Sequence, residues 1–222
     1  MTSPQRTSFA VIKHLLPPDA WAAWRNEAHH GEFDDEPVLV YASDTVLESL
    51  NLDFSSSEAE HVFLILVEGD LQVKTFIYND NVDGATGLIV LGDLRVNTML
   101  VGGQEIYVTG NLAVEELFWG DYNHGSLRVL GNASIAVFAA VDYDVQIKGE
   151  ASLDINLTPE DESSNWQGID IALLQATLVE EVYQLDSVPI EEAAGEEEAE
   201  VELRRGEETL SRLQAGESML KR

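Results

Sequence analysis

Residues 88–96 read LIVLGDLRV, and four other stretches of the chain repeat the same pattern. These are ILVEGDLQV (65–73), IYVTGNLAV (106–114), LRVLGNASI (127–135) and VQIKGEASL (145–153). Apolar residues alternate with other residues around a glycine, and the glycines stand 23, 18, 21 and 18 residues apart. A period near ~20 residues with alternating, often β-branched apolar positions predicts stacked coils of parallel strands rather than helical repeats.

The glycines of the repeat have a structural explanation. In the stretch 88–96, Val90 and Leu94 lie on the same side of an extended chain as Gly92, so the glycine occupies an inward position. Glycine tolerates a bend and a close backbone approach, so we expect a corner at each one. The structural glycines are Gly69, Gly92, Gly110, Gly131 and Gly149. Seven residues after each of the first four glycines stands an apolar residue, namely Phe76, Met99, Leu117 or Phe138. In an unbroken strand this odd separation would place the side chain on the opposite side from the glycine. We expect these to point inward after a second bend or bulge.

Two outward rows of side chains flank the glycines. Directly after them stand Asp70, Asp93, Asn111, Asn132 and Glu150. Turn chemistry explains these residue types, because Asx side chains satisfy backbone groups at bends; a functional acidic stripe is the alternative. The outward positions before the glycines are apolar, namely Leu66, Ile89, Leu91, Tyr107 and Leu130. We expect a terminal segment to cover this apolar row, and a partner site is the alternative.

The fold predicted from these features has an all-β core. It is a single-stranded parallel β-helix of about five to six coils with helical caps at both ends, and we expect the right-handed form that is usual outside the hexapeptide type. The predicted division is an N-terminal helix with capping strands (1–60), the β-solenoid (61–157), a C-terminal capping helix (158–186) and an acidic, partly helical tail (187–222).

The flanking segments carry their own patterns. AWAAWRNEAHH (20–30) follows two prolines and predicts a short helix that displays Trp21 and Trp24. VLVYAS (38–43) and VLESLNLDF (46–54) predict an irregular first coil. Helical spacing of apolar residues predicts a helix over 168–185, and we expect the segment after it to be mobile or dependent on a partner. The spaced residues are Ile171, Leu174, Leu178, Val182 and Leu185.

The chain is strongly acidic, with 41 Asp and Glu against 12 Lys and Arg and a formal charge of −29. Phosphate binding depends on clusters of Lys and Arg, so nucleic acid and anionic membrane are disfavoured and a basic protein partner is favoured. Solubility alone is the alternative explanation. The chain has no cysteine and no apolar run of signal-peptide or membrane-spanning length, so we expect a cytoplasmic protein.

Loops of the solenoid carry the candidate partner-binding residues. The loops 78–87 and 119–126 are rich in aromatic and Asp or Asn residues, and 141–144 occupies the equivalent place one coil later. If the coils stack, these side chains gather along one side, where Trp and Tyr serve as anchors of a protein contact. The candidates are Tyr78, Asp80, Trp119, Asp121, Tyr122, His124, Asp142 and Tyr143.

No catalytic or cofactor motif stands out. Asp121 and His124 could form a metal or acid–base site, but turn-forming Asp and Asn explain the same residues. Gly102 and Gly103 lack the following Lys and Ser or Thr of a phosphate loop, and no nucleophile elbow is present. We therefore expect no enzyme activity, no cofactor and no metal.

The repeat over residues 61–157 resembles that of the bactofilins, bacterial cytoskeletal proteins that polymerise through β-helical cores. The chain departs from that pattern in its variable repeat length, its bulky aromatic loops and its helical ends. The stretch from Gly102 to Asn132 also looks like bacterial proteins named by analogy with bactofilins, some of them associated with toxin–immunity loci.

Two functions follow from these resemblances. The first is a monomeric, acidic immunity or inhibitor protein that binds a bacterial toxin domain. The second is a self-assembling scaffold that forms filaments.

Overall fold

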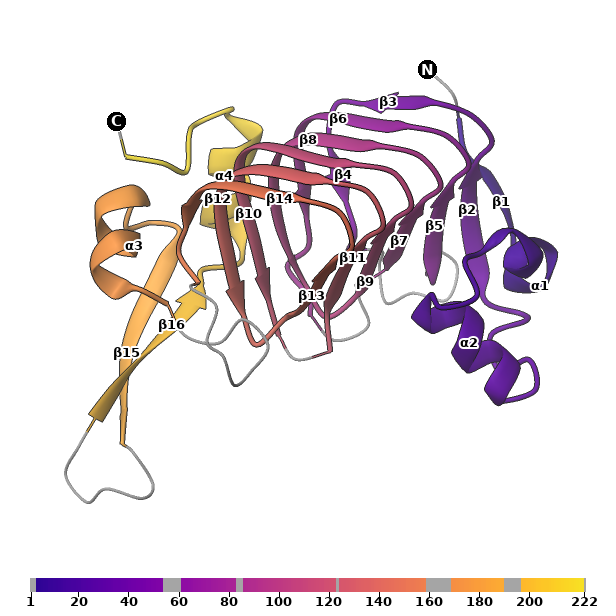
Figure 1. Cartoon of the computed structure of the whole chain (residues 1–222), viewed down its shortest axis with the longest axis horizontal. Helices are drawn as coiled ribbons and strands as arrows, with labels where there is room; N and C mark the ends of the chain where they lie inside the picture. The colour runs from indigo at the N-terminus through magenta and orange to yellow at the C-terminus, as the bar shows by residue number, and fades with distance from the viewer. Residues whose placement is uncertain are drawn as a thin grey trace.

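The computed structural model describes residues 3–53, 61–82, 86–122, 124–158, 169–189 and 197–221. Its centre is a β-solenoid, in which successive strands alternate between two parallel sheets (Figure 1). The first sheet holds β2 (Pro37–Tyr41), β5 (Leu64–Val67), β7 (Gly87–Val90), β9 (Glu105–Val108), β11 (Ser126–Val129) and β13 (Asp144–Ile147). The second holds β3 (Thr45–Leu47), β6 (Leu71–Tyr78), β8 (Leu94–Gly102), β10 (Leu112–Asp121), β12 (Ala133–Val141) and β14 (Ala151–Asn156), and β4 (Leu50–Asn51) also pairs with β6. A parallel β-solenoid is thus confirmed, whereas the number of coils and their hand stay predictions.

The interior of the solenoid is filled by the residues that the repeat places inward. Alternate residues of β5, β7, β9 and β11 stack on the equivalent residues of the next strand, and all of them are buried. These pairs are Ile65 and Val67, Leu88 and Val90, Ile106 and Val108, and Leu127 and Val129. The inward parity predicted from the sequence is confirmed, and burial of these apolar side chains is the main stabilising contribution.

Each glycine corner is joined to the next by an Asx side chain. Oδ1 of Asp44, Asp70, Asp93, Asn111 and Asn132 accepts the backbone N–H of the residue after the next glycine at 2.7–3.0 Å. A Cβ on Gly92 would lie 2.4 Å from Asp70 Oδ1 and 2.7 Å from the carbonyl carbon of Gly69. The corners therefore require glycine because adjacent coils approach closely, and the turn explanation of the Asx residues is confirmed. A function for this acidic row stays a prediction.

The long strands of the second sheet contain bulges. β10 shifts register between Val114 and Leu117 against both of its neighbours, and β6 shifts against β8 between Val73 and Phe76. This confirms an irregularity after the glycine corner but corrects two inward assignments. The extra residue in β6 and β10 turns Phe76 and Leu117 outward. The inward residues at this level are Ile77, Met99, Phe118 and Phe138.

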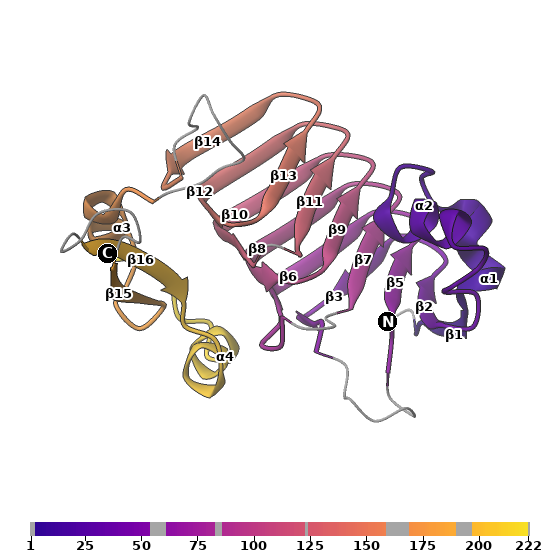
Figure 2. The same ribbon diagram turned by 90° about the horizontal axis from the view of Figure 1, so that it is seen from below.

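The N-terminal segment covers the outer side of the first sheet. β1 (Gln5–Ser8) pairs antiparallel with β2, and α1 (Phe9–Ile12), the 3-10 helix η1 (Lys13–Leu15) and α2 (Trp21–Ala28) follow. Figures 1 and 2 place α1 and α2 beside the first strands of this sheet. Phe9, Ile12 and Leu16 belong to the same buried cluster as Leu66, Ile89 and Tyr107. The prediction that a terminal segment covers the apolar outward row is confirmed.

The C-terminal segment packs on the outer side of the second sheet. It consists of α3 (Ile171–Thr177), β15 (Tyr183–Pro189), β16 (Glu197–Leu203) and α4 (Glu207–Gln214). The helix expected over 168–185 ends at Thr177 instead, because Leu185 pairs with Val201 in the β15–β16 hairpin. The last segment is also not free, since Leu213 and Met219 are buried in a cluster with Phe76 and Trp119.

Candidate functional site

The eight candidate partner-binding residues occupy four different environments rather than one surface. Tyr78 and Trp119 lie beneath the C-terminal segment, and Tyr143 lies inside the solenoid. Asp121 is mostly buried between these regions. The remaining four, Asp80, Tyr122, His124 and Asp142, are exposed or partly exposed on the loops.

Tyr78 and Trp119 are covered because the C-terminal segment docks on the outward face of β6 and β10. Both side chains are 0% exposed. The Tyr78 hydroxyl accepts the N–H of Gly206 at 2.8 Å and donates to Asp80 Oδ1 at 3.3 Å. Burial raises the pKa of Tyr78 to about 12. The expectation that these aromatic side chains lie on the surface is thereby corrected, because they pack against the C-terminal segment of the chain.

Tyr143 is a core residue. Its ring meets Phe118 edge-to-face at 6.1 Å, and its hydroxyl donates to the carbonyls of Gln104 at 3.3 Å and Ser126 at 3.2 Å. Gly120 and Gly125 make room for the ring, since a Cβ there would lie 2.6 Å and 2.1 Å from it. Burial raises the pKa of Tyr143, so the phenol is neutral. The sequence pattern placed this residue in a loop, whereas the structure turns its ring inward.

Asp121 forms an ion pair with Arg205 of the C-terminal segment. The Arg205 guanidinium also donates to the backbone carbonyl of Asn79. The side chains of Arg205 and Asp121 are only 13% and 16% exposed. Burial raises the pKa of Asp121, while the guanidinium of Arg205 acts in the opposite direction. Asp121 therefore binds the C-terminal segment to the solenoid. Its carboxylate is poorly placed to contact a partner.

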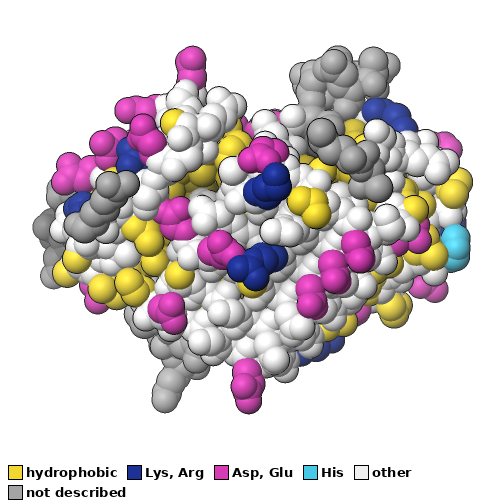
Figure 3. All heavy atoms as spheres, turned by 90° about the horizontal axis from the view of Figure 1, so that it is seen from above, with side chains coloured by type: hydrophobic (Ala, Val, Ile, Leu, Met, Phe, Trp, Pro, Cys, Tyr) yellow, Lys and Arg dark blue, Asp and Glu magenta, His cyan; other side chains and the backbone are white. Residues whose placement is uncertain are grey.

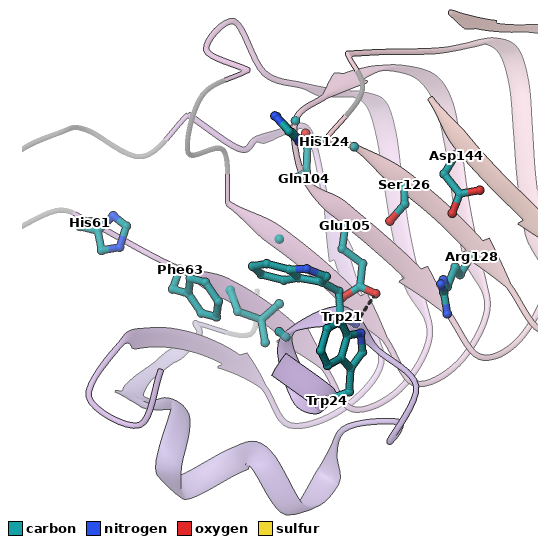
Figure 4. Close-up of a pocket in the computed structure, with 15 residues that line it drawn as sticks. Trp21, Trp24, His61, Phe63, Gln104, Glu105, His124, Ser126, Arg128 and Asp144 are labelled. Atoms are coloured by element: carbon teal, nitrogen blue, oxygen red, sulfur yellow. Dashed lines mark hydrogen bonds between the residues drawn. The ribbon is translucent and has the colours of Figure 1, made fainter. Parts of the chain in front are cut away.

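A separate hollow of about 560 Å³ lies between α2 and the first sheet (Figure 4). Its lining includes Trp21, Trp24, Gln104, Glu105, Arg128 and Asp144. The two tryptophans are 43% and 48% exposed, because α2 buries Ala22 and Asn26 and turns its indoles outward. Large exposed aromatic side chains beside polar groups are typical of contact sites.

Glu105 is the most unusual residue in this pocket, because it is acidic and only 8% exposed. Its Oε1 accepts the backbone N–H of Trp21 at 2.7 Å and so binds the start of α2 (Figure 4). Its Oε2 is buried and has no hydrogen-bond partner among the described residues. Burial raises the pKa of Glu105, opposed by the N–H groups of Trp21 and Ala22 and by Arg128.

Other polar groups complete the wall of the pocket. Gln104 Nε2 donates to Asn79 Oδ1 at 2.9 Å, but Gln104 Oε1 is buried without a partner within the described ranges. Arg128 Nη1 donates to the backbone carbonyl of Asp19 at 3.1 Å. The pocket therefore presents unused buried oxygen acceptors next to exposed indoles, which is a site for a donor group rather than an acceptor.

Sequence patterns pointed to only part of this pocket. The predicted helix displays Trp21 and Trp24, and α2 confirms it. Glu105 lies 84 positions from Trp21 in the sequence, so no local pattern links the two. Its position before the apolar run of β9 is the only sequence signal, since an acid in a fully buried strand is unusual.

The chain matches no protein-family model, no curated protein and no solved structure. Within the described ranges, no three His, Asp or Glu side chains are grouped as the ligands of a metal ion would be. None of the helices in those ranges is both long and apolar enough to span a membrane.

Proposed function

We propose that this protein is a non-catalytic binding protein for a basic protein partner, and that it acts as an immunity-type inhibitor that neutralises a bacterial toxin by direct binding. The observation that carries the proposal is the formal charge of −29. A surface of this sign repels phosphate-rich ligands and attracts basic proteins. Complementary charge also speeds association and disfavours wrong partners.

The acidic side chains are available at the surface. Asp44, Asp70 and Asp93 follow one another along the glycine corner and are exposed, and acidic groups are spread over the face seen in Figure 3. Several basic side chains are already paired within the chain, as in Lys13–Asp34 and Lys74–Glu48. A partner therefore meets a surface whose unpaired charge is mainly negative.

The N-terminal edge of the first sheet supports a discrete binding protein over a polymer. β1 pairs with β2 along its whole length, from Gln5 with Val40 to Ser8 with Pro37. A further solenoid cannot add its own parallel strand to β2 while β1 occupies that edge. Covering an edge in this way is a common means of preventing end-to-end association.

The test uses the proteins encoded beside this gene. Each is purified, mixed with the full chain, and measured by titration calorimetry at rising salt concentrations. We expect one basic neighbour to bind in a defined ratio, to lose its toxic activity, and to bind more weakly as salt rises. Absence of binding to every neighbouring product, or binding that is insensitive to salt, would contradict the proposal.

Self-assembly into a scaffold is the second candidate, and the other end of the solenoid favours it. Among the described residues, β13 pairs only with β11 and β14 only with β12, which leaves one edge of each strand unpaired. Sedimentation velocity at micromolar concentration separates the two candidates. A single slow species supports the binding protein, and filaments support the scaffold.

A further inference from the structure

The pocket beside α2 contains a buried carboxylate oxygen that forms no hydrogen bond with the described part of the chain. Glu105 Oε2 is buried and makes no hydrogen bond with any described residue, although the nearby Ala22 N–H lowers the pKa of the carboxyl group. A carboxylate oxygen that has lost its water without gaining a donor is costly. Because Glu105 lines the pocket, an N–H group of a bound ligand can donate to Oε2 once a small movement of the side chain uncovers that oxygen.

The second feature of the pocket is its aromatic wall. Trp24 is 48% exposed, and within the described ranges no ring or cation stacks on its indole. The neighbouring indole already shows what such a ring accepts: the Arg25 guanidinium lies 5.5 Å from the centre of the Trp21 ring. An exposed indole face in the same pocket as a buried carboxylate favours a cation with a flat, apolar face.

The charges around the pocket favour a cation as well. Glu105 and Asp144 are acidic lining groups, and Arg128 is the basic one. Arg128 already donates to the backbone carbonyl of Asp19. Two histidines complete the titratable groups: His61 Nε2 lies 3.1 Å from Glu36 Oε2, and the His124 ring packs on Tyr122. An anionic ligand would face both carboxylates and the acidic surface beyond them.

We propose that this pocket is the receptor for an arginine side chain of the basic partner, whose guanidinium donates to Glu105 Oε2 and packs against the exposed indole of Trp24. The inference rests on the proposed function, since it names the group by which the partner is recognised. A guanidinium has N–H donors in one plane and a weakly hydrated face, so it can make both contacts together. A lysine ammonium is a compact, strongly hydrated charge and cannot stack in this way.

The probe for this proposal is N-acetyl-arginine amide, titrated into the full chain and followed by tryptophan fluorescence and by the indole N–H signals in NMR spectra. Two control probes are compared with it. N-acetyl-citrulline amide has nearly the same shape but no charge, and N-acetyl-lysine amide has the positive charge but no planar group. We expect the arginine probe to bind at least about tenfold more tightly than either and to shift the Trp24 indole signal. Equal affinity for the citrulline or the lysine probe would overturn the assignment.

Two variants assign the binding to this pocket. In Glu105→Gln, the amide oxygen can still accept from Trp21, while an amide N–H replaces Oε2, so we expect about a tenfold loss of arginine affinity. Trp24→Ala removes the exposed ring, and we expect a severalfold loss. Glu68→Gln is the matched control, because it removes one exposed charge outside the pocket and should bind as the wild type does. Full affinity in Glu105→Gln would show that the probe binds elsewhere.

The outcomes separate this inference from the proposed function. If a basic partner binds with salt-dependent affinity while the arginine probe does not bind, the pocket assignment fails and the proposed function stands. If the probe binds and Glu105→Gln abolishes it while no basic protein binds, the pocket stands and the proposed function fails. Loss of partner affinity in Glu105→Gln, with Glu68→Gln unchanged, supports both.

Discussion

At the scale of single residues, the solenoid depends on a few positions where a side-chain atom or its absence fixes the backbone. The glycine corners and the Asx ladder are one unit: the glycine allows the coils to approach, and the approach brings each Asx oxygen onto the next backbone N–H. The two halves of this unit can be tested separately.

Replacing Gly92 by alanine tests the close approach. The added Cβ would lie 2.4 Å from Asp70 Oδ1 and 2.7 Å from a backbone carbon, so the coils must move apart. We expect the free energy of unfolding to fall by about 1–3 kcal/mol, measured by urea denaturation. Gly87→Ala is the control, because its nearest contact is the end of the Leu64 side chain at 3.1 Å. An equal effect of both substitutions would argue against the corner explanation.

Replacing Asp93 tests the ladder. Asp93 Oδ1 accepts the backbone N–H of Asn111 at 2.7 Å, so Asp93→Ala leaves that donor without its partner. We expect a loss of about 1 kcal/mol in the free energy of unfolding for alanine. Asparagine keeps the oxygen, as Asn111 and Asn132 do in the next two corners, and Asp93→Asn should leave stability nearly unchanged. A large loss in the asparagine variant would mean that the charge, not the acceptor, matters.

The raised pKa of Tyr78 predicts how the stability of the protein depends on pH. Its pKa rises from 10.0 to about 12 on burial, so the fold favours the neutral phenol. This contribution is fully present below pH 10 and is lost as the pH rises toward about 12. We expect the free energy of unfolding to decline in that window, with Tyr78 accounting for roughly 2–3 kcal/mol. Tyr78→Phe should decline less steeply than the wild type, and identical slopes would contradict the assignment.

At the scale of elements, the strands of the solenoid could be predicted and the terminal packing could not. Alternation around Gly92 fixes which side chains face inward, because neighbours in the sequence share a strand. The contact of Arg205 with Asp121 joins residues that are 84 positions apart, so no periodic pattern in the sequence predicts it. The helical spacing after Gly168 predicted a helix through Leu185, but pairing of β15 with β16 outweighs it.

The Arg205–Asp121 pair is expected to hold the C-terminal segment on the solenoid. Arg205→Ala leaves the Asp121 carboxylate largely buried without its cation, which costs about 3 kcal/mol or more in buried pairs. Hydrogen exchange should speed up in β15, β16 and α4 while the strands β7 to β11 keep their protection. The control is Arg204→Ala, whose side chain is exposed. Unchanged exchange in the hairpin would show that the apolar cluster alone holds the segment.

At the scale of the whole molecule, the two terminal segments divide the surface of the solenoid between them. The N-terminal segment covers the first sheet and creates the pocket of Glu105, while the C-terminal segment covers the second sheet and buries the aromatic residues that the sequence had placed at a partner site. The sequence indicated a partner site on the loops around Trp119, whereas the structure indicates one beside the helix that carries Trp24. The pocket could not be predicted because it forms where α2 meets strands of the first sheet that lie far from it in the sequence.

Deletion of residues 1–8 tests whether the N-terminal segment also keeps the molecule discrete. The deletion removes β1, which leaves one edge of β2, from Pro37 to Val40, without its partner at the end of the first sheet, while β5 stays paired with the other edge. At the other end of that sheet, no described residue pairs with the outer edge of β13, so the two ends become able to join head to tail. We expect the full chain to sediment as a monomer and the deletion variant to form larger species as its concentration rises. Arg6→Ala is the control, because it removes a side chain of β1 and leaves the strand in place. A deletion variant that is folded by circular dichroism and still monomeric would show that β1 is not what prevents assembly.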